Sequence, residues 1–293
     1  MALQSSGAIK LSEIQTEFGG DNPIGISEYY RNGIYVARNN TGVPAESTIS
    51  FSDFYGSTSE FTITLTANRS TPTNLRTLAV NAGWDQRDFL KVINNAILSS
   101  NTTATAALTI AGDFPNGVML INNGAIMGMG GQGGDTLQAG KPGGPAIYVT
   151  SDVTIDNPGG IAGGGGGGGA GVYWAWNGYN RSMAGSGGAS GLTAALGGIL
   201  PNQLGGRAYS SRDNDADSLH ETGGPSYNWG WGGRMSSPGG VGGSWGANGD
   251  AGGTVDGNYN QSGYAGGAGG QAVSGNSYVT WVATGTRYGD LIE

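Results

Sequence analysis

Glycine dominates the second half of this chain and limits what it can fold into. Sixty of the 293 residues are glycine, and most of them lie between Gly124 and Gly270. That stretch is roughly one-third glycine, as in collagen. However, it has no strict Gly-X-Y period, and the whole chain has only 10 prolines. Collagen is therefore excluded.

Glycine loses more backbone freedom on folding than any other residue, so a glycine-rich fold needs a compensating backbone geometry. Gly163 to Gly169 are seven consecutive glycines. A left-handed threefold helix, polyglycine II, makes no internal hydrogen bonds and leaves every N–H and C=O free to bond neighbouring helices. We expect stacked polyglycine II helices here. The alternative is disordered tracts, which the clustering of tryptophans between them disfavours.

The composition suggests four regions and a mainly β fold. We expect a small helical attachment region at 1–57 and a β-rich spacer domain at 58–123. A glycine-rich receptor-binding domain at 124–275 would form the polyglycine-helix sandwich with aromatic loops, and 276–293 would form a C-terminal strand and tail.

The first region repeats the pattern apolar, Ser, acid, apolar three times. The copies are Leu11–Ile14, Ile26–Tyr29 and Phe51–Phe54. Each predicts a helix start with Ser as N-cap, an acid in the positive first turn and flanking apolar contacts. Glycines at 19, 33 and 56 predict that these helices are short. So small a core is marginal alone, so the region either docks on a partner or another copy, or caps the next domain.

Residues 58–123 resemble an ordinary folded spacer without a nucleophile–base pair or paired carboxylates. Residues 61–66 alternate as a half-buried strand does, and 107–110 form another strand. Asn74–Ala82 predicts a short helix ended by Gly83. Residues 89–99 fit a helix or a strand.

An internal repeat at an offset of 35 residues aligns 118–128 with 153–163. Both copies have a short strand, an Asn-containing turn, an isoleucine and then a glycine run. Such strand–turn units are typical of a solenoid, in which each coil buries its apolar face on the next.

Charge and motifs exclude several functions. A net charge of -8 argues against nucleic acid and anionic membranes. The sequence shows no cysteine, no N-terminal apolar signal segment and no membrane-spanning apolar run. An aromatic-rich surface binder without an export signal fits a virion part, made in the host cytoplasm and released by lysis.

Several short motifs resemble the fibre proteins of tailed phages. They are Leu11–Ile14, Ile49–Gly56, Val118–Gly124, Ala146–Thr150 and Val279–Gly285. The glycine-rich half is also similar to the tip adhesins of T-even-type long tail fibres. That resemblance implies stacked polyglycine helices whose terminal loops bind the host receptor. Segments between the tracts are longer here, notably 206–222, and the N-terminus differs.

The leading hypothesis is a tail-fibre or tail-tip adhesin for an outer-membrane protein or surface polysaccharide. Trp and Tyr dominate interface hot spots, and alternation places Trp174 with Trp176, and Trp229 with Trp231, on one side of an extended segment. The candidate receptor-binding residues are Tyr173, Trp174, Trp176, Tyr179, Tyr227, Trp229, Trp231, Trp245, Tyr259 and Tyr264. Alternatively, these aromatic side chains cover the flanks of the glycine stack.

The N-terminal turns would dock on the virion. The candidate attachment residues are Leu11, Ile14, Phe18, Ile26, Tyr29, Phe51 and Phe54. The expected partners are a host bacterial surface receptor and other tail or fibre proteins, with a homotrimer of this chain left open. Nucleic acid is not an expected partner.

We expect no enzyme activity, no cofactor and no metal. Asp213 to Glu221 is acidic, but positions six and twelve of a calcium loop would be Ser218 and Gly224. His220 is the only histidine, and the glycine run lacks the Gly-Lys-Ser/Thr of a phosphate-binding loop. The remaining alternatives are a purely structural tail component, a polysaccharide-degrading tailspike and an ice-binding protein.

Overall fold

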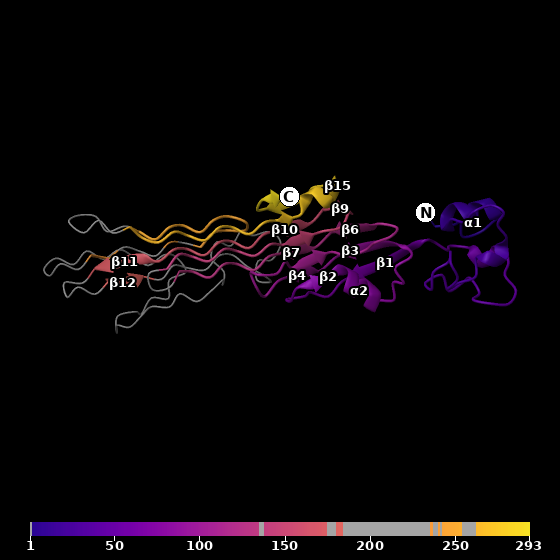
Figure 1. Ribbon diagram of the computed structural model, residues 1–293, viewed down its shortest axis with the longest axis horizontal. Coiled ribbons are helices and arrows are strands. Elements are labelled where there is room, and N and C mark those ends of the chain that lie inside the picture. Colours follow the sequence, from indigo (N-terminus) through magenta and orange to yellow (C-terminus); the bar gives the residue numbers. More distant parts are fainter. Residues whose placement is uncertain are drawn as a thin grey trace.

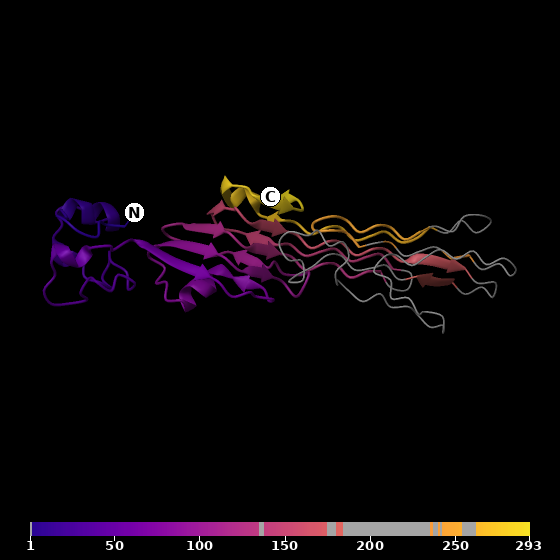
Figure 2. The same ribbon diagram turned by 180° about the vertical axis from the view of Figure 1, so that it is seen from behind.

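The computed structural model describes residues 2–134, 138–174, 180–183, 235–236, 240, 242–253 and 262–293. The molecule is elongated (Figures 1 and 2). A small N-terminal unit lies at one end, a β-solenoid lies in the middle, and long glycine-rich segments extend from the opposite side of the solenoid. Within the described residues, no helix is both long and apolar enough to span a membrane.

The three repeated motifs of the N-terminal unit form three similar turns. They are helix α1 (Leu11–Phe18) and the 3₁₀ helices η1 (Ile26–Glu28) and η2 (Phe51–Phe54). In each, the motif's acid accepts a hydrogen bond from the backbone N–H three residues earlier, at 2.7, 2.7 and 2.8 Å. The predicted Ser N-caps are wrong, because each serine is the second residue of its helix and the N-caps are Lys10, Gly25 and Ser50. The acid therefore gives the motif its structure.

The ends of these turns agree with the glycine prediction at two of three places. Gly19 and Gly56 have φ of 79° and 71°, which favours glycine. Gly33 does not end a helix, because η1 stops at Glu28 and the left-handed residue nearby is Asn32, with φ 70°.

A compact aromatic cluster forms the core of the N-terminal unit. The rings of Phe18, Tyr29 and Phe54 lie 6.3 to 6.5 Å apart, one from each motif segment. Ile9, Ile14, Val36 and Val43 complete the buried core. The unit therefore has a hydrophobic core of its own.

The solenoid consists of three parallel sheets. The first contains β1 (Glu60–Leu65), β3 (Phe89–Asn94), β6 (Val118–Asn122), β9 (Val153–Asp156) and β15 (Val279–Ala283). The second contains β4 (Ile97–Ser99), β7 (Ala125–Met127), β10 (Gly160–Ala162) and β16 (Thr286–Tyr288). The third contains β2 (Thr73–Asn74), β5 (Leu108–Ile110), β8 (Ile147–Val149), β14 (Val273–Ser274) and β17 (Leu291–Ile292). Successive turns of the chain thus stack as coils, and the short 3₁₀ helix η3 (Asn276–Tyr278) precedes the last one.

The predicted solenoid repeat is confirmed. Leu120 pairs with Ile155, and Ile126 pairs with Ile161, both at the offset of 35 residues. The undecided segment 89–99 forms β3 and β4, whose alternate side chains face a core that the neighbouring coils complete. The predicted short helix is α2 (Leu75–Asn81), capped by the Asn74 side chain and followed by Gly83 at φ 103°.

The sheets do not follow the predicted boundary between residues 123 and 124. That position lies between β6 and β7, and all three sheets combine strands from both sides of it. Residues 276–293 also belong to these sheets, as β15, β16 and β17. The described chain after Ser59 therefore contains one solenoid, from which the glycine-rich parts extend.

A buried asparagine ladder fixes the turn between the first two sheets. Asn94 donates to Asn122 at 2.8 Å, and Asn122 donates to Asn157 at 2.7 Å. Asn157 ends the series by donating to the Thr284 carbonyl at 2.8 Å. All three asparagines are fully buried. Because buried amides need partners, the ladder holds successive coils in register.

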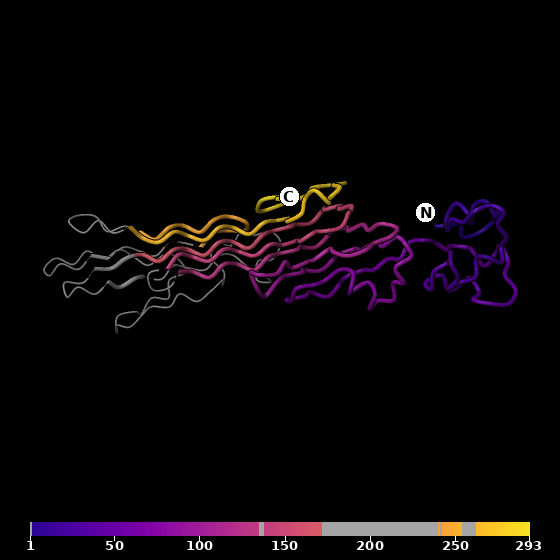
Figure 3. Tube along the Cα trace, in the orientation of Figure 1, coloured from indigo at the N-terminus to yellow at the C-terminus, as the bar shows by residue number. Residues whose placement is uncertain are grey.

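The glycine segments run side by side (Figure 3), and residues 163–170 bond to their neighbours without forming a strand. The central segment 163–170 is fully buried. Carbonyls of 162, 165 and 168 accept from Gly128, Gly131 and Gly134. Carbonyls of 163, 166 and 169 accept from Gly246, Gly243 and Gly240, and those of 164, 167 and 170 accept from Gly270, Gly267 and Tyr264. The partner segment thus changes with each residue and returns every third residue.

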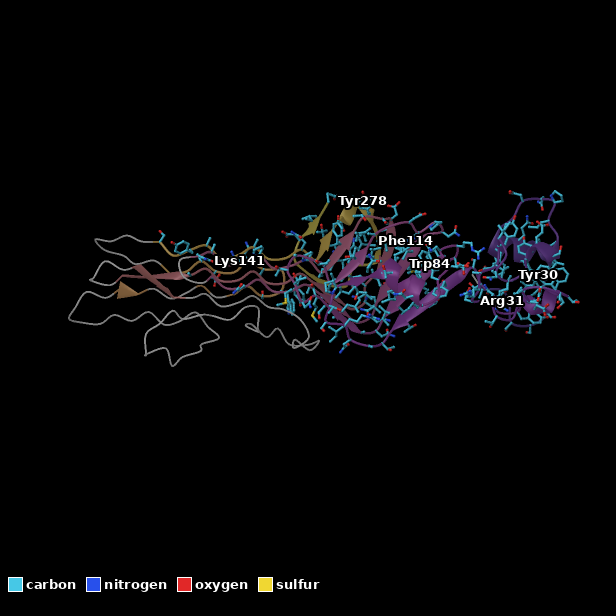
Figure 4. All side chains as sticks on the ribbon, turned by 60° about the horizontal axis from the view of Figure 1, so that its bottom comes forward. Tyr30, Arg31, Trp84, Phe114, Lys141 and Tyr278 are labelled. Carbon is cyan, nitrogen blue, oxygen red and sulfur yellow. The ribbon has the colours of Figure 1, made fainter. Side chains whose placement is uncertain are left out.

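This close packing leaves no room for a side chain at five positions of the central segment: Gly163, Gly164, Gly166, Gly167 and Gly169. A Cβ on Gly164 would overlap the Met129 carbonyl, and one on Gly167 would overlap the Gln132 carbonyl. Side chains occur where the period points outward, as at Ala265 and Ala268. Side chains are correspondingly sparse along these segments and dense on the solenoid (Figure 4). The glycine content therefore reflects backbone-to-backbone packing.

Candidate functional site

The end of the glycine segments away from the solenoid is the candidate functional site, and we call it the distal end. The chain reverses there between Gly134 and Gln138, between Trp174 and Asn180, and between Gly253 and Ser262. Hydrogen bonds bring the three reversals together, because Ala170 donates to Gln138 and accepts from Tyr264. The three chain reversals therefore lie together at one end of the hydrogen-bonded glycine segments.

A small antiparallel sheet extends the central segment at the distal end (Figure 1). Strand β11 (Gly171–Trp174) pairs with β12 (Asn180–Met183) and with β13 (Met235–Ser236). The change from glycine to Val172, Tyr173 and Trp174 coincides with the change from threefold bonding to strand pairing.

The predicted receptor-binding residues divide into three groups. Tyr173 and Trp174 lie on β11 at the distal end. Tyr264 is half-buried there, and its N–H donates to the Ala170 carbonyl at 2.8 Å. The second group lies outside the described residues: Trp176, Tyr179, Tyr227, Trp229, Trp231 and Tyr259. Trp245 alone forms the third group. The acidic run 213–221, with His220, also lies outside them.

Trp245 lies at the opposite end of the glycine segments. It belongs to a turn with Gly246, whose φ is 64°, and it packs against Ala125, Met127 and Ala162 on the second sheet. This contact covers the solenoid, and not the flanks of the glycine stack that the aromatic-flank alternative names. Trp245 therefore attaches the base of the glycine segments to the solenoid, away from the distal end.

The predicted attachment residues also divide by exposure. Ile14, Phe18, Tyr29 and Phe54 are buried in the core of the N-terminal unit, so their side chains stabilise the unit and cannot meet a partner. Leu11 and Ile26 are half-buried, and Phe51 is 42% exposed. The sequence analysis missed Ile34, which is 80% exposed at the tip of a loop. No sequence motif includes Ile34, and only its exposure in the fold makes it a candidate for contact with a partner.

The joint between the N-terminal unit and the solenoid is polar. The Glu17 carboxylate accepts from the Ser59 N–H at 2.8 Å, and Asn39 donates to the Glu60 carbonyl at 3.2 Å. Arg87, which pairs with Asp85 at 2.9 Å, also donates to the Gly33 carbonyl. These hydrogen bonds, made by a few residues, link the N-terminal unit to the solenoid.

Next to this joint lies a buried carboxyl group. Asp88 is 4% exposed, and its Oδ2 atom has no hydrogen-bond partner among the residues that the structure describes. The nearby Trp84 ring stacks on Phe114 at 5.6 Å and donates its N–H to the Asp88 carbonyl at 2.9 Å (Figure 4). Burial, with help from Asp85, raises the pKa of Asp88 to about 7.

Asp88→Asn should remove a pH dependence of stability. Because the pKa of Asp88 is raised in the folded chain, the folded state binds more protons between about pH 4 and 7, and stability falls as pH rises through that range. The shift sets an upper bound of about 4 kcal/mol, and relaxation around the charge should reduce the effect to about 2 kcal/mol. Urea unfolding should therefore show Asp88→Asn to be more stable than the parent at pH 8 and equal to it near pH 4. Asp113→Asn, at an exposed site, is the control; a parent-like profile for Asp88→Asn would contradict the prediction.

The described residues offer little to a reaction. They contain no group of three or more His, Cys, Asp or Glu side chains placed to hold a metal ion. One polar pocket of about 240 Å³ lies in the N-terminal unit, lined by residues 39–42, 53 and 55–58, with Asp53 as its acidic residue. Asp53 Oδ2 already accepts from the Ser50 N–H, which ties it to the cap of η2.

Residues 60–292 match the family described as phage tail fibre adhesin Gp38. The chain belongs to this family. As a Gp38-family adhesin it is a binding protein and not an enzyme, and it is a component of the phage tail. The matched range begins with β1, so it covers the solenoid and the glycine segments, whereas the N-terminal unit precedes it.

A solved structure extends the likeness of this Gp38-family chain over almost its full length. The chain is similar to one in the crystal structure of the gp37–gp38 adhesin tip complex of the bacteriophage S16 long tail fiber. The two share 25% sequence identity, the alignment covers 98% of this chain and 99% of the other, and the TM-score is 0.55. No curated protein sequence matches the chain.

Proposed function

We propose that this adhesin sits at the tip of a tail fibre and binds a receptor on the host surface through its distal end. The observation that carries the proposal is the gathering of three chain reversals at the end opposite the N-terminal unit. An adhesin must present one end to the fibre and the other to the cell, and this arrangement separates those two ends by the length of the molecule. The receptor would be an outer-membrane protein or a surface polysaccharide.

We also propose that the glycine segments are polyglycine II helices. A threefold helix points successive peptide groups in three directions, about 120° apart. The bonding of segment 163–170, in which partners recur every third residue, supports this geometry. Each buried backbone bond contributes on the order of 1 kcal/mol net. Such a lattice would hold the distal loops rigidly without a side-chain core.

The aromatic residues of the distal loops would provide the contact surface. Tyr173 and Trp174 precede one reversal, and Tyr264 follows another. With Trp176, Tyr179 and Tyr259, which belong to the chain between the described flanks of those reversals, they are our candidates for receptor contact. Tyr227, Trp229 and Trp231 precede β13, whose first residue pairs with Trp174 at the distal end. Rigid aromatic side chains give a large contact area at a small entropic cost.

The N-terminal unit would attach the adhesin to the fibre. Phe51 is the exposed member of the predicted set, with Leu11 and Ile26 half-buried. The S16 chain that this protein resembles is part of a complex of gp37 with gp38. A second fibre protein is therefore our proposed partner, and self-association as a trimer is the alternative that solution mass would reveal.

Competition for host cells tests the receptor-binding proposal. Purified protein should block phage adsorption, whereas the Trp229→Ala/Trp231→Ala variant should lose at least about 100-fold in potency, as expected for two hot-spot aromatics. A purely structural tail component would not compete at any concentration.

Two matched variants assign the ends of the molecule. Tyr148→Ala removes an aromatic ring that is 44% exposed on the solenoid and should compete as the parent does. Phe51→Ser should also compete normally as free protein, but should not be incorporated into virions. Normal competition by the double tryptophan variant, with melting unchanged, would refute the assignment of these residues.

A further inference from the structure

The two glycine-rich excursions leave the solenoid at equivalent positions. One extends between β7 and β8, and the other between β10 and β14. Both connect the second sheet to the third. The last coil makes the same connection, from β16 to β17, with Gly289 and Asp290 alone. The solenoid can therefore close this corner with two residues.

The strand register shows that a two-residue closure would fit all three coils. Met127 pairs with Ala162, which pairs with Tyr288, at the ends of the second-sheet strands. Ile147 pairs with Val273, which pairs with Leu291, at the starts of the third-sheet strands. The gap between the sheets is thus the same in each coil.

All three coils have a glycine at the first side of this gap. Gly128, Gly163 and Gly289 each follow the second-sheet strand, and Ala146, Ala272 and Asp290 each precede the third-sheet strand. Ala272 donates to the Asp290 carbonyl at 2.9 Å, and Ile147 donates to the Ala272 carbonyl at 3.1 Å, so these positions are stacked. The excursion 129–145 lies between Gly128 and Ala146, and the excursion 164–271 lies between Gly163 and Ala272.

The hydrophobic core of the solenoid is independent of the excursions. Among the described residues, its core side chains come from 65–126, 146–161, 272 and 273, with Val279 and Trp281 packed against them. The described contact between excursion and solenoid side chains is that of Trp245 on the outer face of the second sheet. The core would therefore keep its burial if the excursions were absent.

We infer that the solenoid is a complete folding unit, and that the glycine-rich part is an insertion through one corner of it. The two excursions depend on each other more than the solenoid depends on either. Gly131 and Gly134 donate to carbonyls of the central segment, and Gly164 and Gly167 donate back to Gly144 and Lys141. Removing one excursion leaves backbone groups of the other without their hydrogen-bond partners. Removing both excursions leaves few backbone groups without a partner.

Deletions in the full chain test this inference. Deleting both 129–145 and 164–271 joins Gly128 to Ala146 and Gly163 to Ala272, which reproduces the closure at Gly289–Asp290. This double deletion should be monomeric and β-rich, and should melt cooperatively within about 10 °C of the solenoid transition of the parent. The expected loss comes from uncovering the Trp245 contact on Ala125, Met127 and Ala162.

A single deletion supplies the decisive contrast. Deleting 164–271 alone leaves segments 128–134 and 138–145 without their central partner, so this variant should aggregate or melt below the double deletion although it retains more of the chain. Failure of the double deletion to fold, or a stability that falls steadily with the number of residues removed, would overturn the inference.

The adsorption readout rests on the proposed function and is separate from folding. A folded double deletion should be incorporated into virions but should not compete for host cells. If it folds and still competes, the receptor site lies elsewhere while the inference about the solenoid stands; if it does not fold, the inference fails while the proposed function remains open to the competition test.

Discussion

Replacing Gly164 and Gly167 by alanine should open the glycine segments and abolish adsorption, while the solenoid stays folded. Each new Cβ would overlap a backbone carbonyl, of Met129 or of Gln132, and backbone in a bonded lattice cannot move aside as a flexible side chain can. Overpacking of a buried site costs about 1–3 kcal/mol, and overlap with fixed backbone should exceed that range. The two substitutions together should therefore cost more than about 5 kcal/mol of local stability.

Amide hydrogen exchange measures this effect segment by segment. The amides of segment 163–170 should exchange at least about 1,000-fold faster in the variant, since each 1.4 kcal/mol is a factor of ten. Amides of β6 and β9 should keep the protection of the parent. Gly160→Ala is the matched control, because a Cβ at Gly160 meets no atom of the described chain within 4 Å. Equal protection of 163–170 in the double variant and in this control would show that the segments are not a close-packed lattice.

Asn122→Ala should destabilise the solenoid by about 4 kcal/mol. The Asn122 amide accepts from Asn94 at 2.8 Å and donates to Asn157 at 2.7 Å and to the Gly160 carbonyl at 3.1 Å. Alanine would leave the Asn157 side-chain oxygen and the Gly160 carbonyl without these donors. A buried polar group left unsatisfied costs about 1–3 kcal/mol, and the vacated volume adds to this.

Asn123→Ala is the control for this substitution. Asn123 is exposed and donates to Asn95 at 2.8 Å, so it makes a similar amide contact in water. Its loss should cost less than about 1 kcal/mol, because water replaces the missing partner. Denaturant unfolding followed by circular dichroism compares the two variants. Similar unfolding midpoints would mean that the buried ladder does not hold the coils together.

Local patterns in the sequence determined much of the secondary structure. The alternation in 61–66 and the Asn74 cap with Gly83 predicted β1 and α2, since both depend on neighbouring residues. The offset of 35 residues predicted the pairing of Leu120 with Ile155, because equal coil lengths bring repeats into register. The glycine tracts indicated segments whose backbones approach closely, because glycine has no side chain.

The N-terminal motif shows where local reasoning stopped. The sequence located all three turns, but Ser and the acid both suit a helix start, and in the fold it is the acid that bonds the N-cap N–H, three residues before it. The same motif could not separate Phe51, which is exposed, from Phe54, which is buried. Which apolar side chain faces the core depends on how the three turns pack against each other.

Only the tertiary structure decided how the regions are connected. Composition changes sharply near Gly124, yet β6 and β7 on either side of it belong to one solenoid, because parallel strands pair over long distances in sequence. The chain leaves the second sheet at Ala162 and returns to the solenoid at Ala272, before β14 of the third sheet, and this return has no local signal. Trp245 illustrates the same limit: its sequence neighbours resemble those of the other tryptophans, but contact with Met127 and Ala162 places it at the base of the glycine segments. Local propensities act over a few residues, whereas the position of each excursion is fixed by hydrogen bonds between segments far apart in the chain.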